Sequence, residues 1–294
     1  MVLSEIRFHT PQTLAEALKL LEELEGARII AGGTDLLADL KQGLAEARNI
    51  ISLHKIKELR GIERRNKKIR IGALTTPQEL MSDSLINQYI PALADTAKSM
   101  ASRQIRSMAT IGGNISSAVP SADLPPSLIV AEAVVELQCS GSSREESLSC
   151  FFTGPRETIC REGELVTFFH IPFPLPNTGI SYKKFVLREA NALSVASVAA
   201  RITLKNGVIA KAAIVLGAVA STPLEVLKAS VFLSGKEPSE SLFQEAALIA
   251  KEESKPISDI RGSIWFRKEL IDVLTRRALD EALSRAQGKF KRGN

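Results

Sequence analysis

The chain has 294 residues, of which 45% are hydrophobic and 24% are charged, so it has the composition of a globular protein with two or three cores. Its formal net charge of +5 is small, its basic residues are interspersed with acidic ones, and one Trp and two Tyr give little aromatic surface for base stacking, which argues against nucleic-acid binding. No apolar run is long enough for a membrane span and residues 1–10 lack the apolar core of a signal peptide, so we expect a cytoplasmic protein.

The N-terminal part of the chain predicts a helix, a strand, a glycine turn and a second helix in that order. Thr10 and Pro11 have the residue types of an N-cap and a first helical position, and leucines then recur at helical spacing until Gly26. We expect the next elements to be a strand, the Gly32-Gly33 turn, a helix closed by Gly43 and a strand, at residues 28–31, 32–33, 35–42 and 49–53.

The middle of the chain predicts strands around a segment of small residues. Residues 107–126 (SMATIGGNISSAVPSADLPP) are rich in glycine, proline and small polar side chains, so we interpret them as a loop outside the core that suits close approach to a ligand. The prolines of residues 171–177 (IPFPLPN) predict a domain boundary. The regular elements are expected as strands at 69–73, 134–139 and 165–171, a helix beginning at Thr76-Pro77 and a helix over 89–100.

The C-terminal part predicts an antiparallel hairpin followed by helices. Asn206-Gly207 lies between two apolar alternating runs, residues 195–204 and 208–219, and this is a strong signal for a tight hairpin turn. Helices are expected over residues 240–254 and 261–286, the second with Ser258-Asp259 as cap candidates and Gly288 as its stop. Apolar residues at helical spacing predict that the last helix packs on the hairpin sheet through Trp265, Leu270, Leu274 and Leu279.

The residues that usually ligate metals or act as nucleophiles form no motif. Cys139, Cys150 and Cys160 are too few and too widely spaced for a cluster, and the three histidines, His9, His54 and His170, show no ligand pair at helical spacing. We therefore expect no iron-sulfur cluster, no metal site and no catalytic side chain in this chain.

Two segments share a local design that favours phosphate binding. Each runs from apolar residues into Gly-Gly and a polar side chain: IAGGTD at residues 30–35 and ATIGGN at residues 109–114. Glycine permits positive φ and close backbone approach, so consecutive N–H groups can converge on a pyrophosphate, and Thr34, Thr110 and Asn114 add side-chain donors. One Gly-Gly alone is more simply a tight turn. Neither segment matches the alternating-glycine dinucleotide fingerprint or the P-loop, so both of those folds are disfavoured.

The two segments also resemble the paired FAD loops of a known family, the flavoprotein subunits of the molybdenum hydroxylases. The likeness is strongest to xanthine dehydrogenase FAD-binding subunits and covers nearly the whole chain. Its motifs are AGGTDLL (31–37), RQIRSMATIGGNI (103–115), SAD (121–123), FFTGP (151–155) and RGSIWFRKEL (261–270).

The resemblance implies an α+β fold: a two-part FAD-binding domain of the vanillyl-alcohol oxidase (PCMH) type, followed by an α+β domain with an antiparallel sheet and helices. The implied parts are a first FAD-binding subdomain, a second FAD-binding subdomain and the C-terminal domain, at residues 1–57, 58–176 and 177–294. The fold is one in which FAD is held without a covalent bond.

Carried over position by position, the family's cofactor contacts fall on both glycine segments and on isolated residues after them. In the resemblance, Ser117 and Asp123 hydrogen-bond near the cofactor, Val166 offers an apolar contact and Lys184 stands near the flavin. The implied FAD-binding residues are Ile29, Ile30, Ala31, Gly32, Gly33, Thr34, Asp35, Leu36, Ala109, Thr110, Ile111, Gly112, Gly113, Asn114, Ser117, Asp123, Val166 and Lys184.

The chain departs from the family pattern at two places. After Lys184 and Arg188 the family typically has an Asp where this chain has Ala192, which removes a carboxylate from the flavin edge; Glu189 and Asn191 are its possible substitutes. Arg156-Glu157 stands where the family more often has a small residue and a lysine.

The resemblance implies an electron relay. A molybdenum-cofactor subunit oxidises a substrate, 2Fe-2S clusters of a third subunit carry single electrons, and the FAD of this chain collects them and passes them to NAD or another acceptor. One alternative is a self-contained flavin oxidase, which needs a substrate-facing acid or base; another is a flavin-free scaffold, which would purify colourless.

Overall fold

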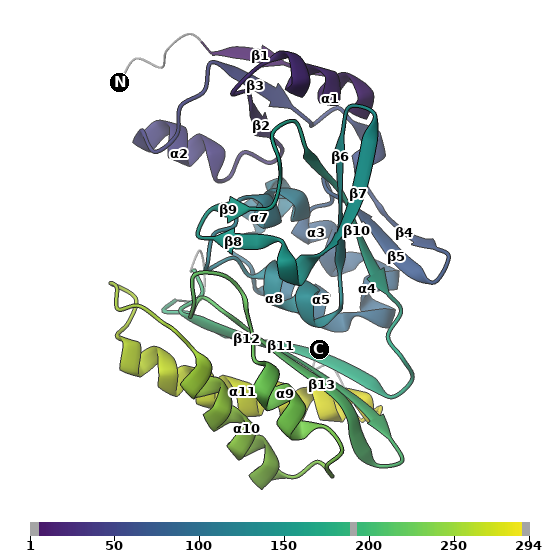
Figure 1. The fold of residues 1–294 in the computed structure, drawn as a ribbon, viewed down its shortest axis with the longest axis vertical. Helices are drawn as coiled ribbons and strands as arrows, with labels where there is room; N and C mark the ends of the chain where they lie inside the picture. Colours follow the sequence, from purple (N-terminus) through teal and green to yellow (C-terminus); the bar gives the residue numbers. More distant parts are fainter. Residues whose placement is uncertain (1–5, 189–192, 290–294) are drawn as a thin grey trace.

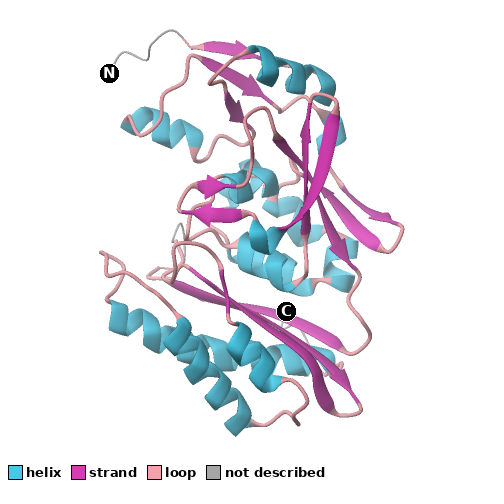
Figure 2. Ribbon diagram, in the orientation of Figure 1, coloured by secondary structure: helices cyan, strands magenta, loops and turns pink. Residues whose placement is uncertain are grey.

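Sheets stacked along the long axis of the molecule divide the chain into three tiers, which the structure, a computed structural model, describes for residues 6–188 and 193–289 (Figure 1). The first tier is a parallel sheet in the order β1-β3-β2 with α1 and α2 beside it (Figure 2). Its elements are β1 (Arg7–His9), α1 (Leu14–Glu23), β2 (Arg28–Ile30), α2 (Leu36–Gln42) and β3 (Asn49–Ser52).

The middle tier is an antiparallel sheet in the order β4-β5-β10-β6-β7, with short helices against one face. Its core contains Ile69, Ile71, Val135, Phe169 and the apolar sides of the helices. Its strands are β4 (Ile62–Arg65), β5 (Lys68–Gly72), β6 (Val134–Cys139), β7 (Ser142–Ser147), β10 (Leu165–Pro172) and the separate pair β8 (Phe152–Gly154) and β9 (Glu157–Thr158). Its helices are η1 (Lys57–Leu59), α3 (Pro77–Ser82), α4 (Ser84–Tyr89), α5 (Pro91–Ser99), α6 (Arg103–Met108), α7 (Ile111–Ser116), α8 (Leu124–Val130) and η2 (Leu148–Cys150).

The third tier is an antiparallel sheet in the order β11-β12-β13-β14, covered on both faces. Helices α9 and α11 pack on one face with α10 against them, and α5 and α8 of the middle tier contact the other face (Figure 1). Its elements are β11 (Thr178–Phe185), β12 (Ala196–Lys205), β13 (Val208–Gly217), β14 (Leu224–Glu225), α9 (Leu227–Leu233), α10 (Glu240–Glu253) and α11 (Ile264–Ala286).

The predicted fold class is confirmed, and so is the Asn-Gly hairpin. Asn206 and Gly207 both have positive φ, 53° and 83°, as the tight hairpin turn between β12 and β13 requires. The helix predicted from Thr76-Pro77 is also present, with Thr76 and Glu79 forming a full capping box. None of the helices in the described ranges is long and apolar enough to cross a bilayer.

Three predicted helix boundaries are wrong. The first helix begins at Leu14 and is capped by Thr13, whose side chain accepts the N–H of Glu16. The helix predicted over 89–100 is present as α5 but begins at Pro91, because Tyr89 is the last residue of α4 and proline cannot continue that helix. The last helix is capped by Ser263, although the Ser258 hydroxyl also accepts the N–H of Ile264 at 3.0 Å.

Two predictions about burial are also wrong. Residues 107–126 are not a loop outside the core: they contain all of α7 and the start of α8, and α8 is buried along its whole length. Small side chains allow this segment to pack tightly between the middle and third tiers. Trp265 is 70% exposed, so it does not share the core face of Leu274 and Leu279.

Candidate functional site

The first glycine segment is a loop between β2 and α2 that presents backbone donors. Gly33 has a φ of +70°, and its carbonyl accepts the N–H of Leu37 at 3.2 Å, which fixes the turn. Within residues 6–188 and 193–289 no acceptor is found for the backbone N–H groups of residues 32–35. These N–H groups are therefore available to a bound anion.

The second glycine segment has a different structure, which corrects the sequence-based expectation. It forms the start of α7, where Thr110 is the N-cap and its hydroxyl accepts the N–H of Gly113 at 3.0 Å. The N–H groups of Ile111 and Gly112 donate to the carbonyls of Thr75 and Ala73 at 2.9 and 2.8 Å. This segment is not a glycine turn with positive φ, and the backbone N–H groups of residues 111–114 already have acceptors inside the protein.

Glycine is needed in the second segment for close packing. A Cβ atom on Gly112 would lie 2.7 Å from the Cβ of Ala73 and 2.8 Å from its carbonyl oxygen, distances that real Cβ atoms do not tolerate. What this segment offers a ligand is a side chain: the Oδ1 atom of Asn114 is buried and has no hydrogen-bond partner in the described part of the chain. An orphaned buried acceptor needs a donor from elsewhere.

The two segments, far apart in sequence, touch each other. A Cβ atom on Gly32 would collide with the carbonyl of Met108, directly before the second segment. The Ser117 hydroxyl donates to Asp35 Oδ2 at 2.8 Å, which joins the end of α7 to the start of α2. The free N–H groups of the first loop and the orphaned amide of Asn114 therefore belong to one region.

Asp123 is the centre of a buried polar network that joins this region to the third tier. Its Oδ1 accepts the hydroxyls of Tyr182 and Ser194 at 2.8 and 2.6 Å, and its Oδ2 pairs with Lys184 Nζ at 3.0 Å. The side chains of Asp123 and Lys184 are 9% and 8% exposed. The lysine predicted near the flavin is thus a buried cation paired with the Asp123 carboxylate, not a surface lysine.

Val166, the remaining predicted contact, lies on the central strand β10. It is buried in β10, and the carbonyl of its neighbour Thr167 accepts the N–H of Ala73 at 2.9 Å. Ala73 is also the residue against which Gly112 packs. Val166 is therefore linked to the second glycine segment through Thr167 and Ala73.

Comparison with known proteins shows the family of the chain. A family model described as the FAD binding domain in molybdopterin dehydrogenase matches residues 4–174, and one described as the CO dehydrogenase flavoprotein C-terminal domain matches residues 180–282. The chain belongs to this flavoprotein family. Among relatives, it is 32% identical to the xanthine dehydrogenase FAD-binding subunit of Escherichia coli O157:H7, covering 97% of this chain and 98% of the relative.

Other relatives of this flavoprotein serve different dehydrogenases. The carbon monoxide dehydrogenase medium chain of Afipia carboxidovorans is 32% identical over 98% of this chain and 100% of its own length. In a solved structure of carbon monoxide dehydrogenase from Hydrogenophaga pseudoflava, the matching chain superposes with a TM-score of 0.93 at 30% identity, covering 97% of this chain and 99% of that one. The fold is therefore that of an oxidoreductase subunit.

The residues of the flavoprotein site fit FAD. The dinucleotide carries a pyrophosphate that needs donors, which residues 32–35 leave free, and polar sugar and ring groups that can satisfy Asn114 Oδ1. Gly32 lets the two segments lie against each other, because a side chain there would collide with the backbone of Met108 and Ala109. Lys184 supplies a fixed positive charge at the border of the third tier.

Several positioning residues of the flavoprotein were missed at the level of sequence. Tyr182 and Ser194 hold Asp123, and the one local signal was that Tyr182 and Lys184, two apart on a strand, share a face. Burial, together with the adjacent Asp123 carboxylate, raises the pKa of Tyr182 well above its usual value, so this phenol stays a neutral donor. Ala73 and Thr75, which receive the second segment's N–H groups, carried no sequence signal.

The departures from the family pattern have different outcomes. Arg156 has a positive φ of 63° and its guanidinium binds both carboxylate oxygens of Asp39 on α2, at 2.6 and 3.2 Å. Arg156 therefore links α2 of the first tier to the turn between β8 and β9. Glu157 begins β9, with its carboxylate against Gly154. Glu189, Asn191 and Ala192 lie outside the described residues.

Proposed function

We propose that this chain is the non-covalent FAD-binding electron-transfer subunit of a multi-subunit molybdenum hydroxylase of the xanthine dehydrogenase type. In this proposal a molybdenum-cofactor subunit oxidises the substrate and an iron-sulfur subunit delivers electrons to the FAD. The proposed final acceptor is NAD. The relatives' names support a dehydrogenase complex, since they include an FAD-binding subunit of xanthine dehydrogenase and a medium chain of carbon monoxide dehydrogenase.

The observation that carries the proposal is the pairing of the first glycine loop with Asn114. Among the described residues, four consecutive backbone N–H groups have no acceptor, and a buried amide oxygen without a partner lies in the segment that packs against them. Leaving such groups unsatisfied is costly for a folded protein, so their coincidence supports a bound polar ligand of fixed shape. We assign the pyrophosphate to residues 32–35 and polar atoms further along the dinucleotide to Asn114, Ser117 and Asp123.

FAD, when bound, supplies the conversion between single-electron and two-electron transfer, and the protein supplies position and electrostatics. Lys184 is held in place by Asp123, which itself is fixed by Tyr182 and Ser194. A buried ammonium favours negative charge placed beside it, so we assign to Lys184 the stabilisation of the reduced, electron-rich state of the bound cofactor. No side chain needs to take or give a proton to a substrate in this role.

The C-terminal domain supports a subunit role over that of a self-contained oxidase. Both faces of its sheet are used for packing, one by α9 and α11 and the other by α5 and α8. Substrate-binding domains need a concave, lined surface, and helices occupy the faces that this sheet has. We therefore propose that substrate binding and hydroxylation belong to a different chain.

The experiment is mild purification of the tagged chain from its native host, followed by analysis of its visible spectrum, metal content and co-purifying chains. We expect a flavin spectrum whose chromophore is released by acid precipitation, together with chains that contain molybdenum and iron. The isolated, FAD-loaded chain should oxidise NADH with an artificial dye yet hydroxylate no purine. Flavin retained in the acid pellet contradicts non-covalent binding. A chain that carries FAD but does not oxidise NADH contradicts only the assignment of NAD as the acceptor. Hydroxylation of a purine by the pure chain contradicts the subunit role.

A further inference from the structure

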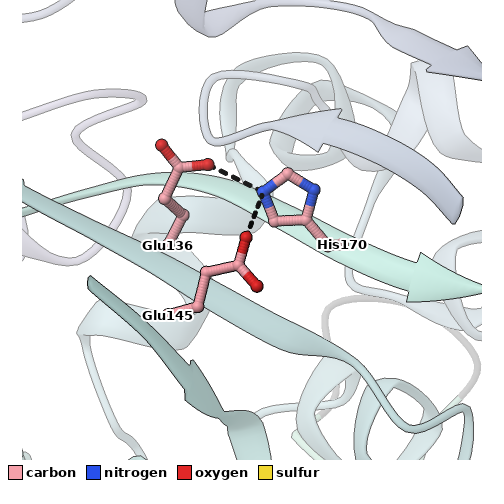
Figure 3. A group of neighbouring side chains, drawn as sticks. All are labelled: Glu136, Glu145 and His170. Carbon is pink, nitrogen blue, oxygen red and sulfur yellow. Dashed lines mark hydrogen bonds and ion pairs between the residues drawn. The ribbon is translucent and has the colours of Figure 1, made fainter. Parts of the chain in front are cut away.

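A cluster of one histidine and two glutamates lies on the face of the middle sheet that points away from its helices (Figure 3). His170 Nε2 lies 2.7 Å from Glu136 Oε2 and 3.9 Å from Glu145 Oε1. The three ligand atoms are all within 4.8 Å of one another. None of these residues takes part in the FAD site described above.

The register of three adjacent strands brings the cluster together. Glu136 on β6 is directly opposite Glu145 on β7, and His170 on β10 pairs with Val134, two residues before Glu136. Like charges directly opposite each other destabilise a sheet. The cluster thus places two anionic groups where the strand pairing alone penalises them, with an imidazole nitrogen pointing between them.

The histidine is fixed, and one carboxylate is free to adjust. His170 is 7% exposed, and Glu136 Oε1 accepts the side-chain amide of Gln138, which leaves Oε2 directed at His170. Glu145 is half-exposed, and its other oxygen lies 3.5 Å from Lys68 Nζ, an exposed pair that a stronger cation can displace.

A second cation near the cluster, Arg70, has its own carboxylate partner. Arg70 is the register neighbour of His170 on β5, so its side chain shares this face. Its guanidinium lies over the ring of Phe168, 3.3 Å from the centroid, and pairs with Glu63 at 3.0 Å. The positive charge of Arg70 is therefore already compensated on the far side of the histidine.

We infer that Glu136, Glu145 and His170 form a binding site for a divalent first-row transition metal ion, with Zn²⁺ as the best match. One imidazole and two carboxylates suit Zn²⁺ and its neighbours, whereas Mg²⁺ and Ca²⁺ prefer oxygen ligands alone. Ligand atoms about 2.0–2.1 Å from a tetrahedral ion are separated by roughly 3.4 Å. The two distances measured from His170 Nε2, 2.7 and 3.9 Å, lie on either side of that value.

The ion has a structural use at this place. Its three ligands come from the adjacent strands β10, β6 and β7, so binding would hold these three strands together. Strand β10, which carries Val166, is the central strand of the whole sheet. An ion that binds the folded chain and not the unfolded one stabilises the fold, and this stabilisation grows with the logarithm of the ion concentration once that concentration exceeds the dissociation constant. A fourth coordination position would be filled by water.

The test is a Zn²⁺ titration of the FAD-loaded chain after removal of metals with a chelator, read by competition with a zinc-binding dye and by bound metal analysis. We expect about one Zn²⁺ per chain and a melting temperature that rises with Zn²⁺. Glu136→Gln and His170→Gln should weaken Zn²⁺ binding by more than about 100-fold. Mutation of a residue that only hydrogen-bonds to a metal ligand costs about 10–100-fold, and loss of a ligand itself should cost more. Glu162→Gln, which removes an exposed carboxylate in the turn before β10 and outside the cluster, should bind Zn²⁺ as the wild type does.

The half-exposed Glu145 keeps the test decisive if a His170 variant does not fold. Glu145→Gln leaves the buried part of the sheet intact and should still weaken binding, while its FAD spectrum matches the wild type. Absence of stoichiometric Zn²⁺ in the wild type overturns the inference. Equal binding by wild type, Glu136→Gln and Glu145→Gln overturns it as well, because the ion would then be held elsewhere.

Discussion

The two glycine segments have nearly the same letters and use glycine for different reasons. In the first, Gly33 supplies a backbone conformation with positive φ, and the N–H groups of residues 32–35 stay free. In the second, Gly112 has no side chain, so the start of α7 can lie against Ala73, and the N–H groups of Ile111 and Gly112 donate to the carbonyls of Thr75 and Ala73. A shared motif therefore does not imply a shared contact with the ligand.

The segments also differ in how they are anchored. The first is a partly exposed loop near the surface ion pair Asp39–Arg156, in a tier that shares a buried apolar cluster with Leu165 and Phe168 of the middle tier. The second leads within nine residues into Asp123, whose buried network reaches the third tier. We expect substitutions around the second segment to affect folding and those around the first to affect mainly FAD.

Asp123→Asn should have the largest effect, because it leaves the buried ammonium of Lys184 without a counter-charge. Breaking a buried ion pair from one side costs about 3–5 kcal/mol. We expect that loss in the free energy of unfolding measured with urea, together with loss of FAD. Adding Lys184→Met should restore most of the stability and none of the FAD. A single variant as stable as the wild type contradicts the anchoring role.

Gly112→Ala should come next, because its Cβ would press on Ala73. Overpacking of this kind costs about 1–3 kcal/mol. Gly113→Ala is the matched control: its Cβ meets only the Thr110 hydroxyl, at 3.0 Å, and alanine is the better helix former by about 0.5–1 kcal/mol. Melting temperatures of the two variants should differ clearly, and equal values would count against the packing role of Gly112.

Gly33→Ala tests the first segment, where the backbone conformation matters. An L residue in the left-handed region costs about 1–2 kcal/mol, and the altered turn should release FAD. Gly33→Asn should retain more FAD, since asparagine tolerates positive φ. Gly26→Ala is the control, because Gly26 has a φ of +68° away from the site. It should lose similar stability and keep its FAD content; a parallel FAD loss refutes the assignment.

Tyr182 offers a test by pH, because its pKa is raised by burial beside Asp123. The stability contributed by the neutral phenol is complete below the unfolded pKa of about 10 and is lost as pH rises toward the folded pKa. In a Tyr89→Phe variant Tyr182 is the last tyrosine, so tyrosinate absorbance should be absent from the folded protein at pH about 11 and present in the unfolded protein. Titration at the unfolded value would show that the phenol is accessible.

Arg156→Ala should have the smallest effect on stability, since its side chain is 56% exposed. Exposed ion pairs contribute about 0.2–1 kcal/mol and weaken with salt. The same small loss is expected for Asp39→Asn, and the double variant should lose no more than either single one. FAD affinity should fall slightly at low salt, and additive losses would show that the two residues act independently.

Sequence patterns predicted the regular elements well where local rules dominate. The Asn206-Gly207 hairpin and the Thr76 cap depend on residues adjacent in the chain, so their signals are local. The boundary at Pro91 was missed although its cause is also local, because the apolar spacing of residues 89–100 concealed the break. Burial of residues 107–126 could not be predicted, since small residues are as common in tight interfaces as in loops.

The sequence by itself determined the kind of protein this is: its family motifs, its antiparallel C-terminal hairpin and the candidate FAD residues, all of which depend on residue type at fixed spacing. The tertiary structure alone decided which of those residues have free hydrogen-bonding groups. Whether an N–H is available depends on acceptors from distant segments, such as Ala73 and Thr75 for the second glycine segment. Long-range strand register likewise gathered His170 with Glu136 and Glu145, since partners 34 and 25 residues apart leave no local periodicity to detect.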